Sequence, residues 1–207
     1  MSLKLKLRSD PWVDEKIFKN LNREIDDGLH VLVGCNGYWK STFMQFIDEQ
    51  YRKDKDYKIL RWNGVTDTRD GKGVALQAQA FELLANMAMS SEGEEHNINL
   101  GLLMNRVGYE VRKLDKNLII LLDAVDSGIS TDRIEETIDV LATIIADVRR
   151  RGYECYIFVP SNTYEMVRHT HCMDPCTGED LVFIDYEHWR KYIFKCAEKI
   201  KKRRIAE

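Results

Sequence analysis

The sequence lacks a hydrophobic run long enough to cross a membrane, and it lacks a strong net charge. No apolar stretch among its 207 residues reaches the roughly 18 to 20 residues that a spanning helix needs. A formal net charge of −3 predicts no general attraction to nucleic acid or to a membrane surface. The N-terminus has no signal-peptide core, and the five cysteines have no paired spacing. These absences predict a cytoplasmic protein with a single domain over residues 1–207.

Apolar periodicity predicts strands that alternate with helices along the chain. Strands are expected at Leu3–Leu7, Phe18–Ile25, Val31–Val33, Tyr57–Trp62, Leu118–Leu122, Tyr156–Val159 and Leu181–Ile184. Helices are expected at Thr42–Gln50, Val74–Met89, Leu100–Leu114, Ser130–Val148 and Tyr186–Arg204. Thr170–Ile184 is expected to form a hairpin around its Pro and Gly turn. The pattern predicts an α/β fold with a mainly parallel sheet, flanked by helices and ending in an antiparallel edge.

One stretch, Leu29–Phe46, combines an apolar strand, a glycine-containing turn and the start of an amphipathic helix. Gly34, Lys40 and Ser41 fall in the register of the phosphate-binding P-loop. Lys40 would reach the terminal phosphates and Ser41 would bind Mg²⁺, while backbone N–H groups at the helix start hold the phosphates.

The P-loop pattern lacks the glycine that normally precedes its lysine, because Trp39 stands there. An indole at this position either occupies the phosphate space and deforms the loop, or turns outward and packs near Tyr38. Of the two, the sequence favours impaired nucleotide binding, since a bulky residue also restricts φ where glycine is free.

A second apolar run, Leu118–Leu122, ends in Asp123 and is typical of a Walker B strand. Downstream of a P-loop, this aspartate is expected to hold Mg²⁺. The next residue, Ala124, lacks the carboxylate that activates water in many hydrolytic P-loop proteins. Asp126 is the remaining candidate for that catalytic role, beside Lys40.

Three further patterns suggest sites, and for each the simpler explanation is favoured. Ser90–Glu94 precedes a helix and would bind a phosphate held by another subunit, but a solvated loop is favoured. His169, His171, Cys172 and Cys176 offer zinc-compatible side chains, although incidental clustering is favoured. Lys199–Arg204 is basic, but the acidic remainder favours a solvated helix end over nucleic-acid binding.

Taken in order, these segments resemble an ABC-type ATPase of the SMC and recombination-repair kind. The resemblance lies in Phe18–Leu21, Val31–Thr42, the loop Ser91–Glu94, and Leu121–Ser130, which is similar to a Walker B strand and D-loop. The nearest likeness is to compact, phage-type AAA/ABC-like ATP-binding proteins without a coiled coil. It covers most of the chain.

The resemblance implies a P-loop NTPase fold and ATP held between the P-loop of one subunit and the signature loop of another. It carries phosphate and Mg²⁺ binding to Gly34, Asn36, Gly37, Lys40, Ser41 and Thr42. It assigns Mg²⁺ binding to Asp123. It assigns contact with the γ-phosphate held by the partner subunit to Ser91 and Gly93. Gln77 or Gln79 would be the Q-loop glutamine, and the sequence does not choose between them.

Three positions depart from that family together: Trp39, Ala124, and Pro160–Asn162 in place of a histidine. The leading hypothesis is therefore an ABC-like protein that binds ATP and Mg²⁺ and dimerises across the nucleotide, with slow or absent hydrolysis. The alternatives are a P-loop nucleotide kinase and a non-catalytic binding module that has lost nucleotide.

Overall fold

The structure is a computed structural model of the whole chain. It describes residues 2–6, 21–63, 101, 105, 107–126, 130–168 and 170–206, without the side chains of Asp132 and of residues 204–206. The statements below concern these residues.

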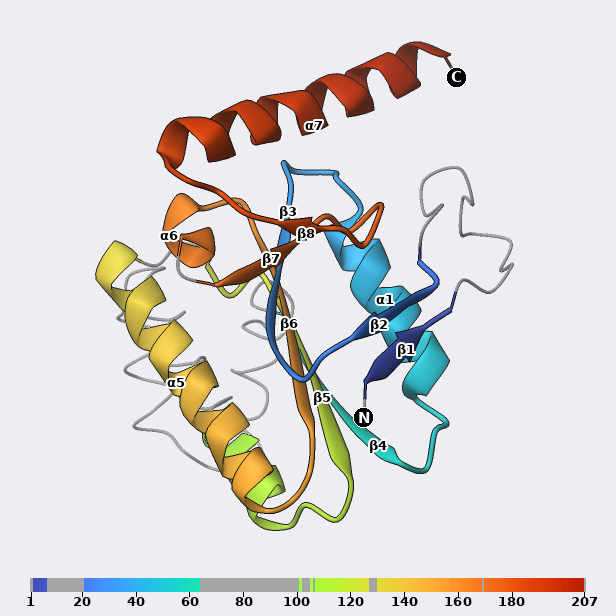
Figure 1. Cartoon of the computed structure of the whole chain (residues 1–207), viewed down its shortest axis with the longest axis vertical. Helices are drawn as coiled ribbons and strands as arrows, with labels where there is room; N and C mark the ends of the chain where they lie inside the picture. Colours follow the sequence, from blue (N-terminus) through green and yellow to red (C-terminus); the bar gives the residue numbers. More distant parts are fainter. Residues whose placement is uncertain are drawn as a thin grey trace, which may run out of the picture.

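A six-stranded sheet forms the centre of the molecule (Figure 1). In spatial order its strands are β4 (Tyr57–Asn63), β5 (Asn117–Asp123), β6 (Cys155–Ser161), β3 (Gly28–Val33), β7 (His171–Met173) and β8 (Asp180–Leu181). The first five are parallel to their neighbours, and β8 is antiparallel to β7. The expected α/β class, mainly parallel sheet and antiparallel edge are therefore confirmed.

Successive strand residues face opposite sides of the sheet, and each side has its own core. On one side, Leu118, Ile120 and Leu122 join buried residues of α5 (Thr131–Arg150). On the other, Ile119 and Leu121 pack with the buried face of α1 (Lys40–Tyr51). This explains the unbroken apolar run that the sequence has at β5.

A small antiparallel pair covers part of the α1 side. It consists of β1 (Leu3–Leu5) and β2 (Arg23–Ile25), and Leu3, Leu5 and Ile25 join the α1 core. The predicted alternation at the N-terminus is confirmed for Leu3–Leu5, whereas Leu7 and residues 18–20 lie outside the described part.

Two more helices and a helical segment at residues 107–112 complete the described architecture. The short α6 (Tyr164–Val167) follows β6, and α7 (Tyr186–Ala206) crosses above the carboxyl ends of the strands, close to the loop after β3 (Figure 1). Residues 107–112 are helical, as predicted, and the expected helix Val74–Met89 lies outside the described residues. No helix in the described part combines the length and apolarity needed to cross a bilayer.

One local expectation needs correction. The predicted strand Leu181–Ile184 ends at Leu181, and Val182 and Ile184 are 79% and 85% exposed. The register pairs Met173 with Asp180 and Cys172 with Leu181, and regular pairing stops there. Ser130 does occupy the N-cap of α5, but its side chain makes no capping hydrogen bond.

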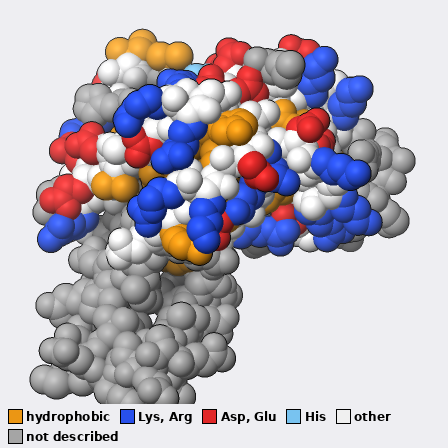
Figure 2. All heavy atoms as spheres, turned by 90° about the horizontal axis from the view of Figure 1, so that it is seen from below, with side chains coloured by type: hydrophobic (Ala, Val, Ile, Leu, Met, Phe, Trp, Pro, Cys, Tyr) orange, Lys and Arg blue, Asp and Glu red, His pale blue; other side chains and the backbone are white. Residues whose placement is uncertain are grey.

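Figure 2 shows the end of the molecule opposite the loop after β3. Lysine and arginine side chains are numerous there, and acidic and hydrophobic side chains lie among them. Arg149 and Arg150, in the last turn of α5, pair with Asp27 and Asp147. Basic residues at a helix C-terminus complement its dipole, which explains these two without a ligand.

Candidate functional site

Two glycines shape the loop between β3 and α1. Gly34 is buried, and a Cβ there would lie 2.4 Å from Cδ1 of Tyr38, so only glycine fits. The backbone N–H of Tyr38 donates to the carbonyl oxygen of Cys35 at 3.1 Å and closes a turn. Gly37 has φ of 79°, a conformation that favours glycine.

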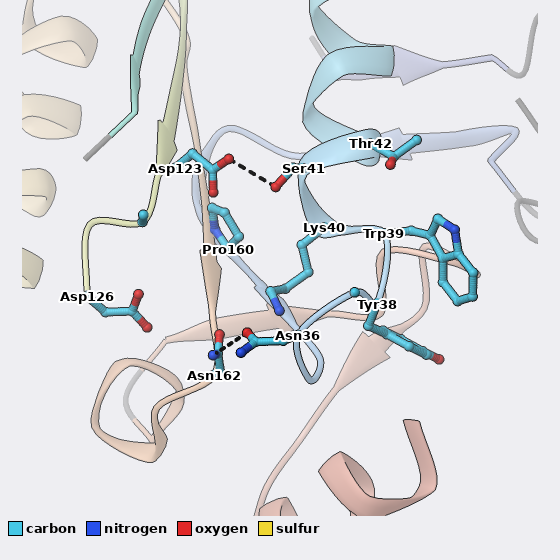
Figure 3. Close-up of a pocket in the computed structure, with 12 residues that line it drawn as sticks. Asn36, Tyr38, Trp39, Lys40, Ser41, Thr42, Asp123, Asp126, Pro160 and Asn162 are labelled. Atoms are coloured by element: carbon cyan, nitrogen blue, oxygen red, sulfur yellow. Dashed lines mark hydrogen bonds between the residues drawn. The ribbon is translucent and has the colours of Figure 1, made fainter. Parts of the chain in front are cut away.

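Trp39 adopts the left-handed conformation, with φ 52° and ψ 18°, at the N-cap of α1. Its carbonyl oxygen accepts a hydrogen bond from the N–H of Phe43 at 2.9 Å, so the first helical turn is intact. The indole points away from Lys40 and Asp123 (Figure 3). Its ring centroid lies 5.8 Å from that of Tyr38 and 5.2 Å from the guanidinium carbon of Arg203. This is the outward arrangement that the sequence analysis gave as the alternative.

Lys40 lies at the start of α1 with its ammonium folded back into the loop. Nζ donates to the carbonyl oxygens of Gly34 at 2.6 Å and Cys35 at 2.9 Å. Burial lowers the pKa of Lys40, and the neighbouring Cys35, Asp126 and Asp123 oppose that shift. The charge is thus held against the carbonyl groups at the place where P-loop proteins carry phosphates.

Ser41 and Asp123 come together although 82 positions separate them. Ser41 Oγ donates to Asp123 Oδ2 at 2.9 Å (Figure 3). Asp123 is the last residue of β5, and Ala124 turns the chain away with φ of 56°. Asn63 Nδ2 also approaches Asp123 Oδ2, at 3.4 Å, because the parallel register aligns these two residues.

The end of β6 adds a group of polar residues that the sequence analysis did not assign to the site. Ser161 Oγ donates to Asp126 Oδ2 at 2.6 Å, and Thr163 Oγ1 lies 3.3 Å from the same oxygen. Asn162 Nδ2 donates to Asn36 Oδ1 at 2.9 Å. These contacts arise because β6 lies between β3 and β5, so its carboxyl end reaches the site from the middle.

Together these residues enclose a cavity of about 420 Å³. Its lining consists of Asn36, Gly37, Tyr38, Trp39, Lys40, Ser41, Thr42, Asp123, Ala124, Asp126, Pro160 and Asn162. The volume is in the range of small-ligand sites. The site is thus built from a strand, a glycine-dependent loop and a helix that starts with Lys40, at the carboxyl end of a mainly parallel sheet.

Several sequence-predicted residues lie outside this group. Ser91, Gly93, Gln77 and Gln79 fall in residues 64–100, which the structure does not describe. Gly34 is not among the described residues that line the cavity. It packs closely against Tyr38, which does line the cavity. Asn63, Ser161 and Thr163 were missed, and the available signal was their polar character at the ends of strands β4 and β6.

The proposed zinc cluster has other partners in the structure. Nδ1 of His171 lies 3.2 Å from Nδ1 of His30, and its Nε2 lies 2.8 Å from Asp180 Oδ1. Cys172 Sγ donates to the carbonyl oxygen of Val167 at 3.4 Å. His169 is not described, and the described residues contain no group of three or more His, Cys, Asp or Glu side chains suited to a metal.

No protein-family model matches the sequence. No curated protein matches it either. Among solved structures, a chain of the Escherichia coli MS115-1 HORMA:CdnC:Trip13 complex aligns over 68% of this chain, at 13% identity and a TM-score of 0.37. Cdc6p from Pyrobaculum aerophilum aligns over 86%, at 16% identity and a TM-score of 0.36. The chain covers 43% and 41% of these two chains. At these identities and TM-scores, the two likenesses do not assign the chain to a family.

Proposed function

We propose that this protein binds a nucleoside triphosphate, ATP, together with Mg²⁺ at the loop between β3 and α1. The observation that carries the proposal is the hydrogen bond between Ser41 Oγ and Asp123 Oδ2 at 2.9 Å. A hydroxyl and a carboxylate are the oxygen ligands that Mg²⁺ takes beside substrate phosphates. The cation would bind at this pair, with the phosphates over the backbone N–H groups of residues 36–42.

Lys40 supports the same proposal. In the structure, its ammonium donates hydrogen bonds to the carbonyl oxygens of Gly34 and Cys35. Phosphate oxygens carry more negative charge than carbonyl oxygens, so a bound triphosphate would compete well for the same donor. Trp39 leaves this space open, because its indole points away from Lys40 (Figure 3).

Hydrolysis is expected to be slow or absent. Ala124 offers no proton acceptor after Asp123. Asp126 is the other carboxylate of the cavity lining, and its Oδ2 is engaged by Ser161 and Thr163. Asp126 therefore remains the candidate for orienting water, with low efficiency.

We further propose that ATP controls dimerisation, as the resemblance to ABC-type ATPases implies. Among the described residues that line the cavity, Lys40 is the one cation, and the carboxylates there are those of Asp123 and Asp126. One lysine and one Mg²⁺ do not neutralise a triphosphate beside two carboxylates. Donors from a second subunit would balance this charge, and Ser91 and Gly93 are the residues that we propose for that role.

Calorimetric titration with ATP, with and without Mg²⁺, tests the binding site. Lys40→Ala should weaken binding at least tenfold, because a hydrogen bond to a charged group contributes about 1.5–3 kcal/mol. Asp123→Asn should weaken binding mainly when Mg²⁺ is present. Lys53→Ala is the matched control, since Lys53 is an exposed lysine beyond the far end of α1.

Light scattering with and without MgATP tests dimerisation. The proposal expects the mass to double with MgATP in the wild type and to stay unchanged in Lys40→Ala. A wild-type protein that binds no nucleotide would refute the proposal and favour a module that has lost nucleotide. Transfer of phosphate to a nucleoside monophosphate would favour the kinase alternative instead.

A further inference from the structure

The cavity has two chemically different ends. Asp123, Asp126 and Asn162 form one end, and Trp39 and Thr42 lie on the other side of Lys40 (Figure 3). Mg²⁺ bridges the terminal phosphates in P-loop proteins, and the pair Ser41–Asp123 marks its place at the first end. A nucleotide in this orientation would extend its sugar and base toward Trp39 and Thr42.

Trp39 is held in place by two apolar clusters and by Arg203. It packs against the apolar cluster of α1 and against the cluster formed by Tyr38, Cys176 and Cys196. The guanidinium carbon of Arg203, on α7, lies 5.2 Å from its ring centroid, a cation–π distance. Trp39 still lines the cavity and is only half-buried, so part of the residue borders the open space.

We propose that the indole of Trp39 is a stacking platform for the nucleobase, which makes it a specificity-determining residue of the proposed ATP site. This inference rests on the proposed function. An aromatic ring that is already fixed loses little freedom when a base stacks on it. Every base has a π-face, and a purine offers the larger one, so the platform favours purine over pyrimidine nucleotides.

The test compares MgATP with Mg-tripolyphosphate, which has the phosphates but no base. Dissociation constants are measured for the wild type, Trp39→Phe and Trp39→Leu. Trp39→Leu should weaken MgATP binding about tenfold, at the lower end of the effect of base–aromatic stacking. Tripolyphosphate binding should be unchanged, and Trp39→Phe should retain most of the affinity for MgATP. Trp39→Leu keeps an apolar side chain against the two clusters, which separates stacking from packing.

Tryptophan fluorescence provides a second measurement, which needs only the wild type and the aromatic variant Trp39→Phe. The emission difference between the wild type and Trp39→Phe isolates Trp39, and ATP should quench it while tripolyphosphate should not. Equal weakening of ATP and tripolyphosphate in Trp39→Leu would overturn the inference, and so would unchanged ATP affinity. Tripolyphosphate binding that depends on Lys40 supports the proposed site independently. A wild type that binds neither ligand would overturn both proposals.

Discussion

The left-handed backbone of Trp39 predicts an unusual response to substitution. At most helix positions glycine is less stable than alanine by about 1 kcal/mol. Trp39 has φ of 52° and ψ of 18°, where any residue with a Cβ is strained. We therefore compare Trp39→Ala with Trp39→Gly, two variants that both lack the indole and differ only in the Cβ.

The magnitude follows from two opposing terms. Strain in the left-handed region costs an L-residue about 1–2 kcal/mol. Glycine avoids this strain, but its larger loss of conformational entropy on folding destabilises it by about 0.5–1 kcal/mol relative to alanine. The difference predicts that Trp39→Gly is more stable than Trp39→Ala by about 0.7 kcal/mol. Both should be less stable than the wild type, because the ring packs against two apolar clusters.

Urea unfolding at 25 °C, followed by circular dichroism, measures the free energy of unfolding of each variant. Ala142→Gly is the matched control, since Ala142 is an exposed alanine inside α5. Ala142→Gly should lower the free energy of unfolding by about 1 kcal/mol. Glycine should therefore be less stable than alanine at position 142 and more stable than alanine at position 39. If glycine is also the less stable residue at position 39, the loop does not have the backbone described here.

Three further predictions concern other parts of the chain. Burial lowers the pKa of His30 to about 4, so the unfolded state binds more protons below pH 6.5. The free energy of unfolding should fall by about 1.6 kcal/mol between pH 6.5 and pH 5, and His30→Asn should remove that slope; an unchanged slope would contradict it. Gly34→Ala should lower both the melting temperature and the ATP affinity, because its Cβ meets Tyr38 at 2.4 Å; wild-type affinity would show that the loop tolerates the change. Asn63→Ala should weaken Mg²⁺-dependent ATP binding a few-fold through lost support of Asp123, with binding in the absence of Mg²⁺ unaffected; equal weakening without Mg²⁺ would contradict this role.

The sequence by itself determined the parts that depend on local pattern. Gly34, Lys40 and Ser41 were identified because strand, loop and helix follow one another within a short stretch. The β5 strand and its final residue, Asp123, were predicted because a strand buried on both faces is apolar at every position. The exposed apolar residues Val182 and Ile184 show the limit of this reasoning, since their pattern resembles a strand but the pairing with β7 ends at Leu181.

Only the tertiary structure decided which distant residues meet at the site. Ser161 and Asn162 reach it because β6 lies between β3 and β5, and strand order depends on how the two cores pack. Asn63 reaches Asp123 through the register of two parallel strands. Trp39 had been expected to obstruct phosphate, and its orientation follows from its backbone angles and its contacts with the surrounding clusters and α7. Periodicity along a chain records which face is buried, but not which partner lies opposite, because that choice depends on packing among elements far apart in sequence.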